Sequence, residues 1–144
     1  MLKNTDLFVD TSGWAYALDS QADEYAAVSN VIIGATRQNR ALVTTNYIVA
    51  ELVALLSTAR FRISRQSIIE RINAMKVDPN IEILHLDADT DTEAWKLLET
   101  RPDKEWSLVD ASSFVVMQRF GLTEALTSDH HFTQAGFVRL PHYN

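Results

Sequence analysis

The sequence predicts a single α/β domain over residues 1–144, built on a mostly parallel sheet of about five strands with helices on both faces. Short apolar runs alternate with longer segments of helical periodicity, as in strand–helix–strand crossover units. No internal repeat, low-complexity tract or linker interrupts this alternation. A length of 144 residues fits one domain with a sizeable core.

Short apolar runs bounded by turn-forming residues indicate buried strands. The first run, Leu7-Phe8-Val9, ends in Asp10-Thr11-Ser12-Gly13, which predicts a turn into a helix. The five expected strands cover residues 7–9, 41–44, 81–86, 124–127 and 137–140.

Apolar spacing predicts the helices between these strands. Thr45 or Asn46 can cap the helix that runs apolar to Leu56, and Gly121 is a usual C-terminal stop. In the segment that begins at Asp87, Trp95, Leu97 and Leu98 are expected to face inward. After the turn at 10–13, the expected helices cover residues 23–40, 48–56, 64–78, 87–100, 107–120 and 131–134.

Composition excludes several classes of protein. Hydrophobic residues make up 47% and charged residues 22%, as in an ordinary globular domain. There is no long apolar span, and the N-terminal MLKNTD lacks the apolar core of a signal peptide, so a cytoplasmic location is expected. Without cysteine the chain has no disulfide and no thiolate metal ligand, so oxygen or imidazole must hold any metal.

The charge is uneven. A net charge of -6 is unusual for a nucleic-acid binder. The stretch from Arg60 to Lys76, however, carries five basic residues and only Glu70 opposes them. It can line a path for a phosphate backbone or form a solvated helix face, and the sequence does not separate the two.

Four carboxylates stand where the sequence is otherwise apolar: Asp10, Glu51, Asp110 and Asp129. Buried charges are normally paired, hydrogen-bonded or bound to a metal. Asp10 and Asp129 follow strands, while the other two lie in early helical turns, so a parallel sheet brings all four toward one edge. Hard oxygen ligands suit Mg²⁺ or Mn²⁺, and such ions polarise phosphates and activate water.

Each acid also has a structural explanation. Asp10 and Asp129 can be turn or helix-cap residues, which is the commoner role for either one taken alone. Glu51 has the weakest such alternative, because it falls on the side of Ile48 and Leu55 in a helix that is apolar nearly all round.

Asp110 has the strongest rival explanation. Ser107-x-x-Asp110 matches a capping box, in which the acid reaches back to the first backbone N–H of the helix. The spacing also aligns Asp110 with Phe114 and Met117, on the apolar side. Both interpretations remain open from the sequence.

Polar residues beside the acids can orient them as hydrogen-bond partners. Thr11, Ser12, Asn46 and Ser107 are the candidates, and helix capping is the alternative for each. The pair His130-His131 is a weak metal-binding signal by itself.

Three aromatic residues lie beside the acidic motifs and could stack on a base. These are Trp14, Tyr47 and Trp106, and core packing is the commoner fate of such residues.

In this order the four motifs resemble those of the PIN-domain nucleases, in particular the VapC-like toxins of type II toxin–antitoxin pairs. FVDTSGW and TTNYIVAEL are similar to the first two motifs and supply Asp10 and Glu51. DKEWSLVDASSFVVM is the most specific match and supplies Asp110. ALTSDHHFTQAGF resembles the fourth and supplies Asp129, although His131 stands where many relatives carry a further acid.

The resemblance implies a three-layer α/β/α sandwich and an endoribonuclease that depends on Mg²⁺ or Mn²⁺. The four acids would be catalytic and metal-binding residues, and His131 a further neighbour of the site. Arg60, Arg62 and Arg65 would hold the RNA backbone. The resemblance also implies a small antitoxin as partner, and a homodimer.

Three other functions fit parts of the same pattern: RNA processing outside a toxin system, a non-catalytic RNA- or protein-binding module, and a phosphatase with Asp10 as nucleophile. Phosphatases of that kind usually place a second Asp two residues on. Ser12 occupies that position here, which argues against the third alternative.

Overall fold

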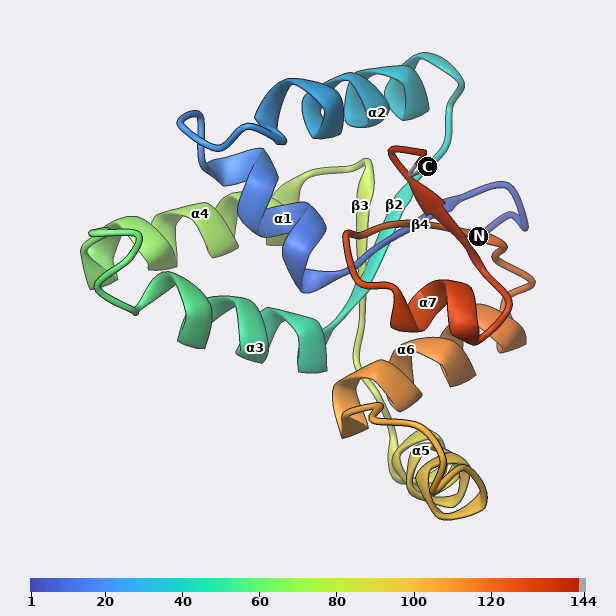
Figure 1. The fold of residues 1–144 in the computed structure, drawn as a ribbon. Helices are drawn as coiled ribbons and strands as arrows, with labels where there is room; N and C mark the ends of the chain where they lie inside the picture. Colours follow the sequence, from blue (N-terminus) through green and yellow to red (C-terminus); the bar gives the residue numbers. More distant parts are fainter. Residues whose placement is uncertain (143–144) are drawn as a thin grey trace.

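The computed structural model describes residues 1–142 and contains one five-stranded sheet in that part of the chain (Figure 1). The strands are β1 (Leu7–Val9), β2 (Leu42–Thr45), β3 (Ile81–Leu84), β4 (Glu124–Leu126) and β5 (Val138–Leu140). Their order is β3-β2-β1-β4-β5, and every neighbouring pair is parallel. The expected α/β class and strand number are confirmed.

Seven helices cover the sheet in the described part of the chain. They are α1 (Thr11–Leu18), α2 (Tyr25–Arg37), α3 (Asn46–Leu56), α4 (Arg65–Val77), α5 (Ala88–Thr100), α6 (Leu108–Arg119) and α7 (His131–Gln134). The helices α1 to α4 lie on one side of the strands and α5 to α7 on the other (Figure 1). Right-handed crossovers give this division, because the chain moves outward along the sheet through β3 and then returns to β4. None of the described helices is long and apolar enough to cross a membrane.

The helix starts follow the expected capping chemistry. Thr45 Oγ1 accepts a hydrogen bond from the Ile48 N–H at 3.2 Å, so Thr45 is the cap of α3 and Asn46 is its first residue. Ser64 and Ser107 cap α4 and α6 in the same way. Gly121 follows α6 with φ +67°, a left-handed conformation that glycine adopts without strain.

The expectation that Trp95 faces inward is wrong. Its side chain is 50% exposed, while Ala94 is fully buried and Leu97 and Leu98 are half-buried. Helix α5 packs against α6. It turns the small Ala94 toward the core, which leaves the adjacent Trp95 about 100° away on the outer side.

The strand order reverses between β1 and β4, and α1 packs very close to β4 there. A Cβ atom added to Gly13 would lie 2.4 Å from the Leu126 backbone carbonyl oxygen. The Leu126 oxygen also accepts the Asp10 N–H at 3.1 Å. Glycine at position 13 therefore lets the start of α1 approach the end of β4, where ligands bind in open parallel sheets.

We predict that Gly13→Ala lowers the free energy of unfolding by about 1–3 kcal/mol, the usual cost of overpacking against atoms that cannot move aside. Urea denaturation followed by circular dichroism measures the change. Gly34→Ala is the matched control, because a Cβ there meets nothing within 4 Å, and it should raise stability by up to about 1 kcal/mol. Equal effects of the two substitutions would contradict this account of Gly13.

Candidate active site

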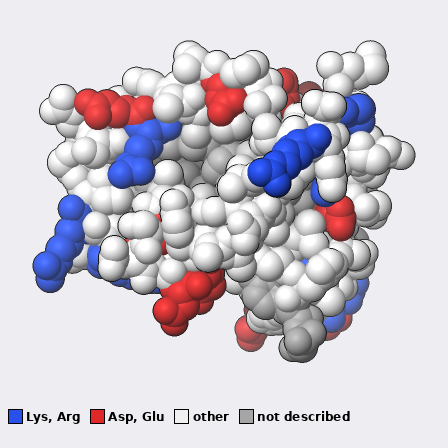
Figure 2. Space-filling model, turned by 90° about the horizontal axis from the view of Figure 1, so that it is seen from above, with Lys and Arg blue, Asp and Glu red and all other residues white. Residues whose placement is uncertain are grey.

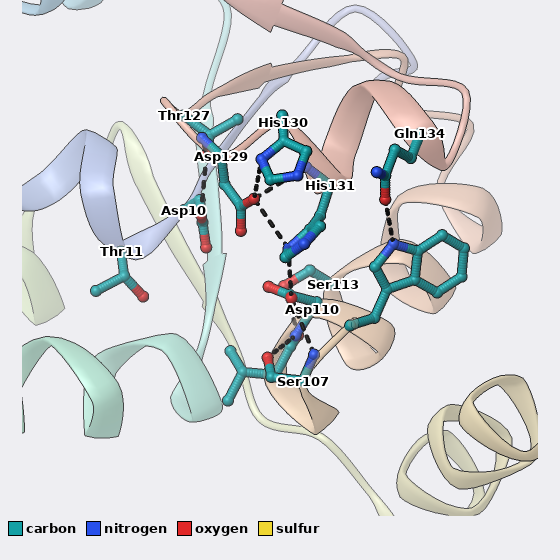
Figure 3. Close-up of polar contacts among 12 residues, drawn as sticks. Asp10, Thr11, Ser107, Asp110, Ser113, Thr127, Asp129, His130, His131 and Gln134 are labelled. Atoms are coloured by element: carbon teal, nitrogen blue, oxygen red, sulfur yellow. Dashed lines mark hydrogen bonds and ion pairs between the residues drawn. The ribbon is translucent and has the colours of Figure 1, made fainter. Parts of the chain in front are cut away.

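The acids predicted from the sequence gather at the carboxyl edge of the sheet, around the switch between β1 and β4. Asp10 follows β1 directly, and Asp129 lies three residues after β4. Asp110 is in the first turn of α6, and Glu51 is in the second turn of α3. In Figure 3 the side chains of Asp10, Asp110 and Asp129 point into one region between α1, α6 and α7.

Asp10 is the most deeply buried of the four acids. It is 5% exposed, and Thr127 Oγ1 donates a hydrogen bond to its Oδ2 at 2.9 Å. Burial is the main cause that raises the pKa of Asp10 to about 7, and the charges of Asp110 and Glu51 contribute to this rise. Although Asp10 precedes α1, its side chain makes no capping hydrogen bond, so the cap interpretation does not explain its position.

Asp110 forms the capping box and also faces the acidic cluster. Its Oδ2 accepts the Ser107 N–H at 3.0 Å, and Ser107 Oγ accepts the Asp110 N–H at 3.0 Å. Burial is the main cause that raises the pKa of Asp110, and the Asp129 charge adds to it while His131 opposes it. Asp110 therefore caps its helix and also faces the other acids, so the two interpretations left open by the sequence are compatible.

Glu51 differs from the expectation, because it is exposed rather than buried. The buried face of α3 consists of Ile48, Leu52 and Leu56, and Glu51 lies beside this face. The Thr11 hydroxyl nevertheless donates a 2.5 Å hydrogen bond to Glu51 Oε1. This contact links the start of α1 to α3 and directs Glu51 toward the other acids.

Asp129 and His131 form the fourth part of the cluster. Asp129 Oδ1 accepts the His131 backbone N–H at 2.9 Å and lies 3.0 Å from His131 Nδ1. His131 Nδ1 also lies 3.3 Å from Asp110 Oδ2. One potential ligand atom from each of Asp129, His130 and His131 lies within 4.8 Å of the others, although the His130 side chain is 67% exposed.

Thr127 is a site residue that the sequence reasoning missed. It is 1% exposed, donates to Asp10, and accepts the Asp129 N–H at 3.0 Å. Ser12 Oγ lies 3.2 Å from Thr127 Oγ1 and accepts the Ser128 N–H at 2.9 Å. These contacts place Ser12 next to Thr127, whose hydroxyl binds Asp10. The sequence signal that could have identified Thr127 is a hydroxyl residue at the end of an expected strand, two residues before an acid.

Asn46, expected to orient the acids, makes no hydrogen bond to them within the described residues. Its Oδ1 accepts the Leu86 N–H at 2.9 Å, which ties the segment after β3 to the start of α3.

The aromatic residues beside the motifs are engaged within the fold. Trp14 is buried and donates to Thr44, and Trp106 is buried and donates to Gln134. The Tyr47 hydroxyl donates to Asp91. For the two tryptophans the packing interpretation is correct.

Arg60, Arg62 and Arg65 are exposed, and none of them forms an ion pair within the described residues. Arg60 lines a pocket between α1 and α3 together with Ser12 and Asp19. Its guanidinium carbon lies 5.1 Å from the Phe61 ring centroid. The face seen in Figure 2 shows acidic and basic side chains intermixed, without a continuous basic patch.

The parallel sheet with acids clustered at its switch point agrees with the fold and site that the sequence resemblance implied. The PIN domain family model matches residues 7–138, so the chain belongs to the PIN-domain family. The chain is 30% identical over 134 residues to proteins named 23S rRNA-specific endonuclease VapC20 from two strains of Mycobacterium tuberculosis, CDC 1551 / Oshkosh and ATCC 25618 / H37Rv. The match covers 93% of this chain and 97% of each relative.

Solved structures agree with this assignment. The crystal structure of Mycobacterium tuberculosis VapC20, described as a Sarcin-Ricin loop cleaving toxin, has a TM-score of 0.81 and 28% identity, and the match covers 92% of this chain and 97% of that chain. FitAcB from Neisseria gonorrhoeae has a TM-score of 0.62 at 18% identity, with 92% and 95% covered, and supports the fold alone.

We predict that the metal-free protein loses stability as the pH rises from about 4 to 7. The pKa of Asp10 is higher in the folded state than its ordinary value of 3.8, so the folded protein keeps a proton that the unfolded chain releases. With about 1.4 kcal/mol for each pKa unit, a rise to about 7 lowers the free energy of unfolding by at most about 4 kcal/mol. Above pH 7 no further loss from Asp10 is expected.

Urea denaturation in EDTA, across this pH range, measures the effect. Asp10→Asn removes the titrating group, so its stability should fall less than that of the wild type between pH 4 and 7. Parallel profiles for the two proteins would show that Asp10 does not carry the dependence.

Proposed function

We propose that this protein is a metal-dependent endoribonuclease that hydrolyses RNA phosphodiester bonds and acts as the toxin of a toxin–antitoxin pair. The observation that carries the proposal is the set of acids from four separate segments at the switch point of a PIN-domain fold, where Asp10 is affected by the charges of Asp110 and Glu51, and Asp110 by that of Asp129. Asp10, Glu51, Asp110 and Asp129 are its proposed catalytic residues. The relatives named for 23S rRNA make ribosomal RNA the first substrate to test.

The site residues fit a divalent cation such as Mg²⁺ or Mn²⁺. Carboxylate oxygens are the ligands that these ions prefer. Among the described residues, Glu51 Oε2 and Asp129 Oδ2 make no hydrogen bond, so each has an oxygen available to a cation. The pKa of Asp10 is raised mainly by burial and to a smaller extent by the charges of Asp110 and Glu51, and a bound cation would offset both effects. A bound ion supplies Lewis-acid polarisation of the phosphate and of water.

The chain's own residues hold the acids in place before any ligand arrives. Thr127 fixes one oxygen of Asp10, the Ser107 N–H fixes one oxygen of Asp110, and Thr11 fixes one oxygen of Glu51. These donors come from the residue after β4, the N-cap of α6 and the first residue of α1, so packing of the sheet and its helices sets the separation of the acids. Such preorganisation is what a site for charge stabilisation requires.

The pocket between α1 and α3 supports a path for the RNA backbone toward the acids. It runs from Ser12 to Arg60, whose side chain is free of ion pairs within the described residues. Arg62 and Arg65 follow in the same segment and extend the positive charge. Unpaired RNA fits this path better than a duplex, because its backbone is flexible.

A small antitoxin and a second copy of this chain are the proposed protein partners. The similarity to a structure described as a toxin supports the antitoxin, whereas the second copy rests on the resemblance of the sequence motifs alone. The gene next to the one for this chain tests the toxin role. If that gene encodes a small protein that blocks growth arrest caused by this chain, the toxin role is supported. Growth unaffected by expression of this chain favours RNA processing outside a toxin system.

Asp10→Asn and Asp110→Asn should each reduce RNA cleavage in Mn²⁺ by about two orders of magnitude or more. A metal-binding charge that stabilises the transition state contributes several kcal/mol, and 1.4 kcal/mol is tenfold in rate. Asparagine can still accept the hydrogen bonds from Thr127 and Ser107, so the local fold should be kept.

Single-turnover cleavage of labelled ribosomal RNA measures this loss. Asp23→Asn removes an exposed acid before α2 and is the charge-matched control. Cleavage at the wild-type rate by both site variants would overturn the proposed nuclease site.

Arg60→Ala should weaken RNA binding and lower the dependence of log K on log salt by about 0.7, the change for one lost phosphate contact on a single strand. Fluorescence anisotropy in the Asp110→Asn background measures binding without cleavage. Arg37→Ala is the control, because Arg37 is the last residue of α2 and lies at the edge of the sheet where the strands begin. A slope unchanged by Arg60→Ala would exclude this path.

A further inference from the structure

His131 places an imidazole nitrogen between two of the acids. The Nδ1 atom lies 3.0 Å from Asp129 Oδ1 and 3.3 Å from Asp110 Oδ2, and Figure 3 shows the ring reaching between these carboxylates. The His131 side chain is 19% exposed, and its Nδ1 atom is fully buried.

These contacts do not satisfy Nδ1 as hydrogen bonds. Within the described residues, Nδ1 of His131 is the buried side-chain polar atom that has no partner of acceptable geometry. The nitrogen therefore lies close to both oxygens without pointing straight at either. A buried polar atom left in this state is unfavourable unless a further group binds it.

A cation between the three atoms accounts for this arrangement. Neighbouring ligands in an octahedral shell of about 2.1 Å radius are about 3.0 Å apart, close to the two separations at Nδ1. Neutral imidazole is a ligand for Mn²⁺ and later transition metals, whereas Mg²⁺ prefers oxygen almost exclusively. A ligand set of two oxygen atoms and one nitrogen atom therefore shifts the preference of the site from Mg²⁺ toward Mn²⁺.

The fold holds His131 rigidly in this position. It is the first residue of α7, and its backbone N–H is bound by Asp129. The next residue, Phe132, is fully buried and packs edge-on against Phe114 of α6 at 5.0 Å. Because Asp110 also belongs to α6, the imidazole and both carboxylates share one packed unit.

The neighbouring His130 fits this role poorly. Its side chain is 67% exposed, and its Nδ1 lies 3.9 Å from Asp129 Oδ1. Its ring lies over His131 with centroids 4.4 Å apart. It serves as the matched control, because it is the same residue type in the adjacent position.

We propose that His131 Nδ1 is a direct ligand of the divalent ion, together with Asp110 and Asp129, and that it makes the site favour Mn²⁺ over Mg²⁺. This inference rests on the proposed metal-dependent function. It assigns to His131 the place that an acid fills in many related chains.

Pulsed EPR of the purified protein with one equivalent of Mn²⁺ tests the proposal. The wild type should show nitrogen coupling from one imidazole, and labelling with [¹⁵N]histidine should change that signal. The coupling should vanish in His131→Gln and persist in His130→Ala. Titration calorimetry should show that His131→Gln lowers the ratio of Mn²⁺ to Mg²⁺ affinity on the order of tenfold, the lower end of losses seen at metal sites.

The outcomes separate this proposal from the proposed function. Mn²⁺ bound with oxygen ligands alone would overturn the role of His131 and leave the metal site intact. Coupling that persists in His131→Gln and vanishes in His130→Ala would also overturn it. Failure of the wild type to bind Mn²⁺ at all would overturn both. The labelled wild-type spectrum shows whether a histidine binds the ion even where His131→Gln does not fold, and His130→Ala, a change at an exposed side chain, then separates His130 from His131.

Discussion

Repulsion between carboxylates at the β1–β4 switch is the constraint on which this structure depends. Asp10 is buried there, and the charges of Asp110 and Glu51 disfavour its ionised form further. The fold tolerates this because hydroxyl and backbone donors hold three of the acids: Thr127 binds Asp10, Ser107 binds Asp110 and Thr11 binds Glu51. Gly13 makes the arrangement possible, since it lets α1 approach β4 until Thr127 reaches Asp10.

The acids serve the fold and the site at once. Asp110 closes the capping box of α6, and its charge is favoured by the helix N-terminus. The same contact fixes the carboxylate that faces His131. Asp129 Oδ1 accepts the backbone N–H of His131, the first residue of α7, and so fixes where this helix begins. A ligand that also starts a helix has few conformations to lose when a cation binds, which favours binding.

The sequence was sufficient for the architecture and for most of the site. Alternation of apolar runs and helices determines the parallel sheet, and an apolar context identified the buried Asp10 and Asp110. The same logic failed for Glu51, because α3 is apolar nearly all round and its pattern does not define which side is buried. Thr127 was missed because a single hydroxyl at a strand end carries no periodic signal. Its importance comes from contacts with residues more than 100 positions away.

The acidic net charge of -6 is compatible with RNA binding when charge is considered locally. Interactions between exposed charges are screened over about 8–10 Å in physiological salt, so distant acids weigh little against unpaired arginines such as Arg60. The acids of the site are different, because they lie where a phosphate must approach. Without a cation they repel it, and with a cation they attract it. Under the proposed function the metal therefore controls substrate binding as well as hydrolysis, and RNA affinity near the site should follow metal occupancy.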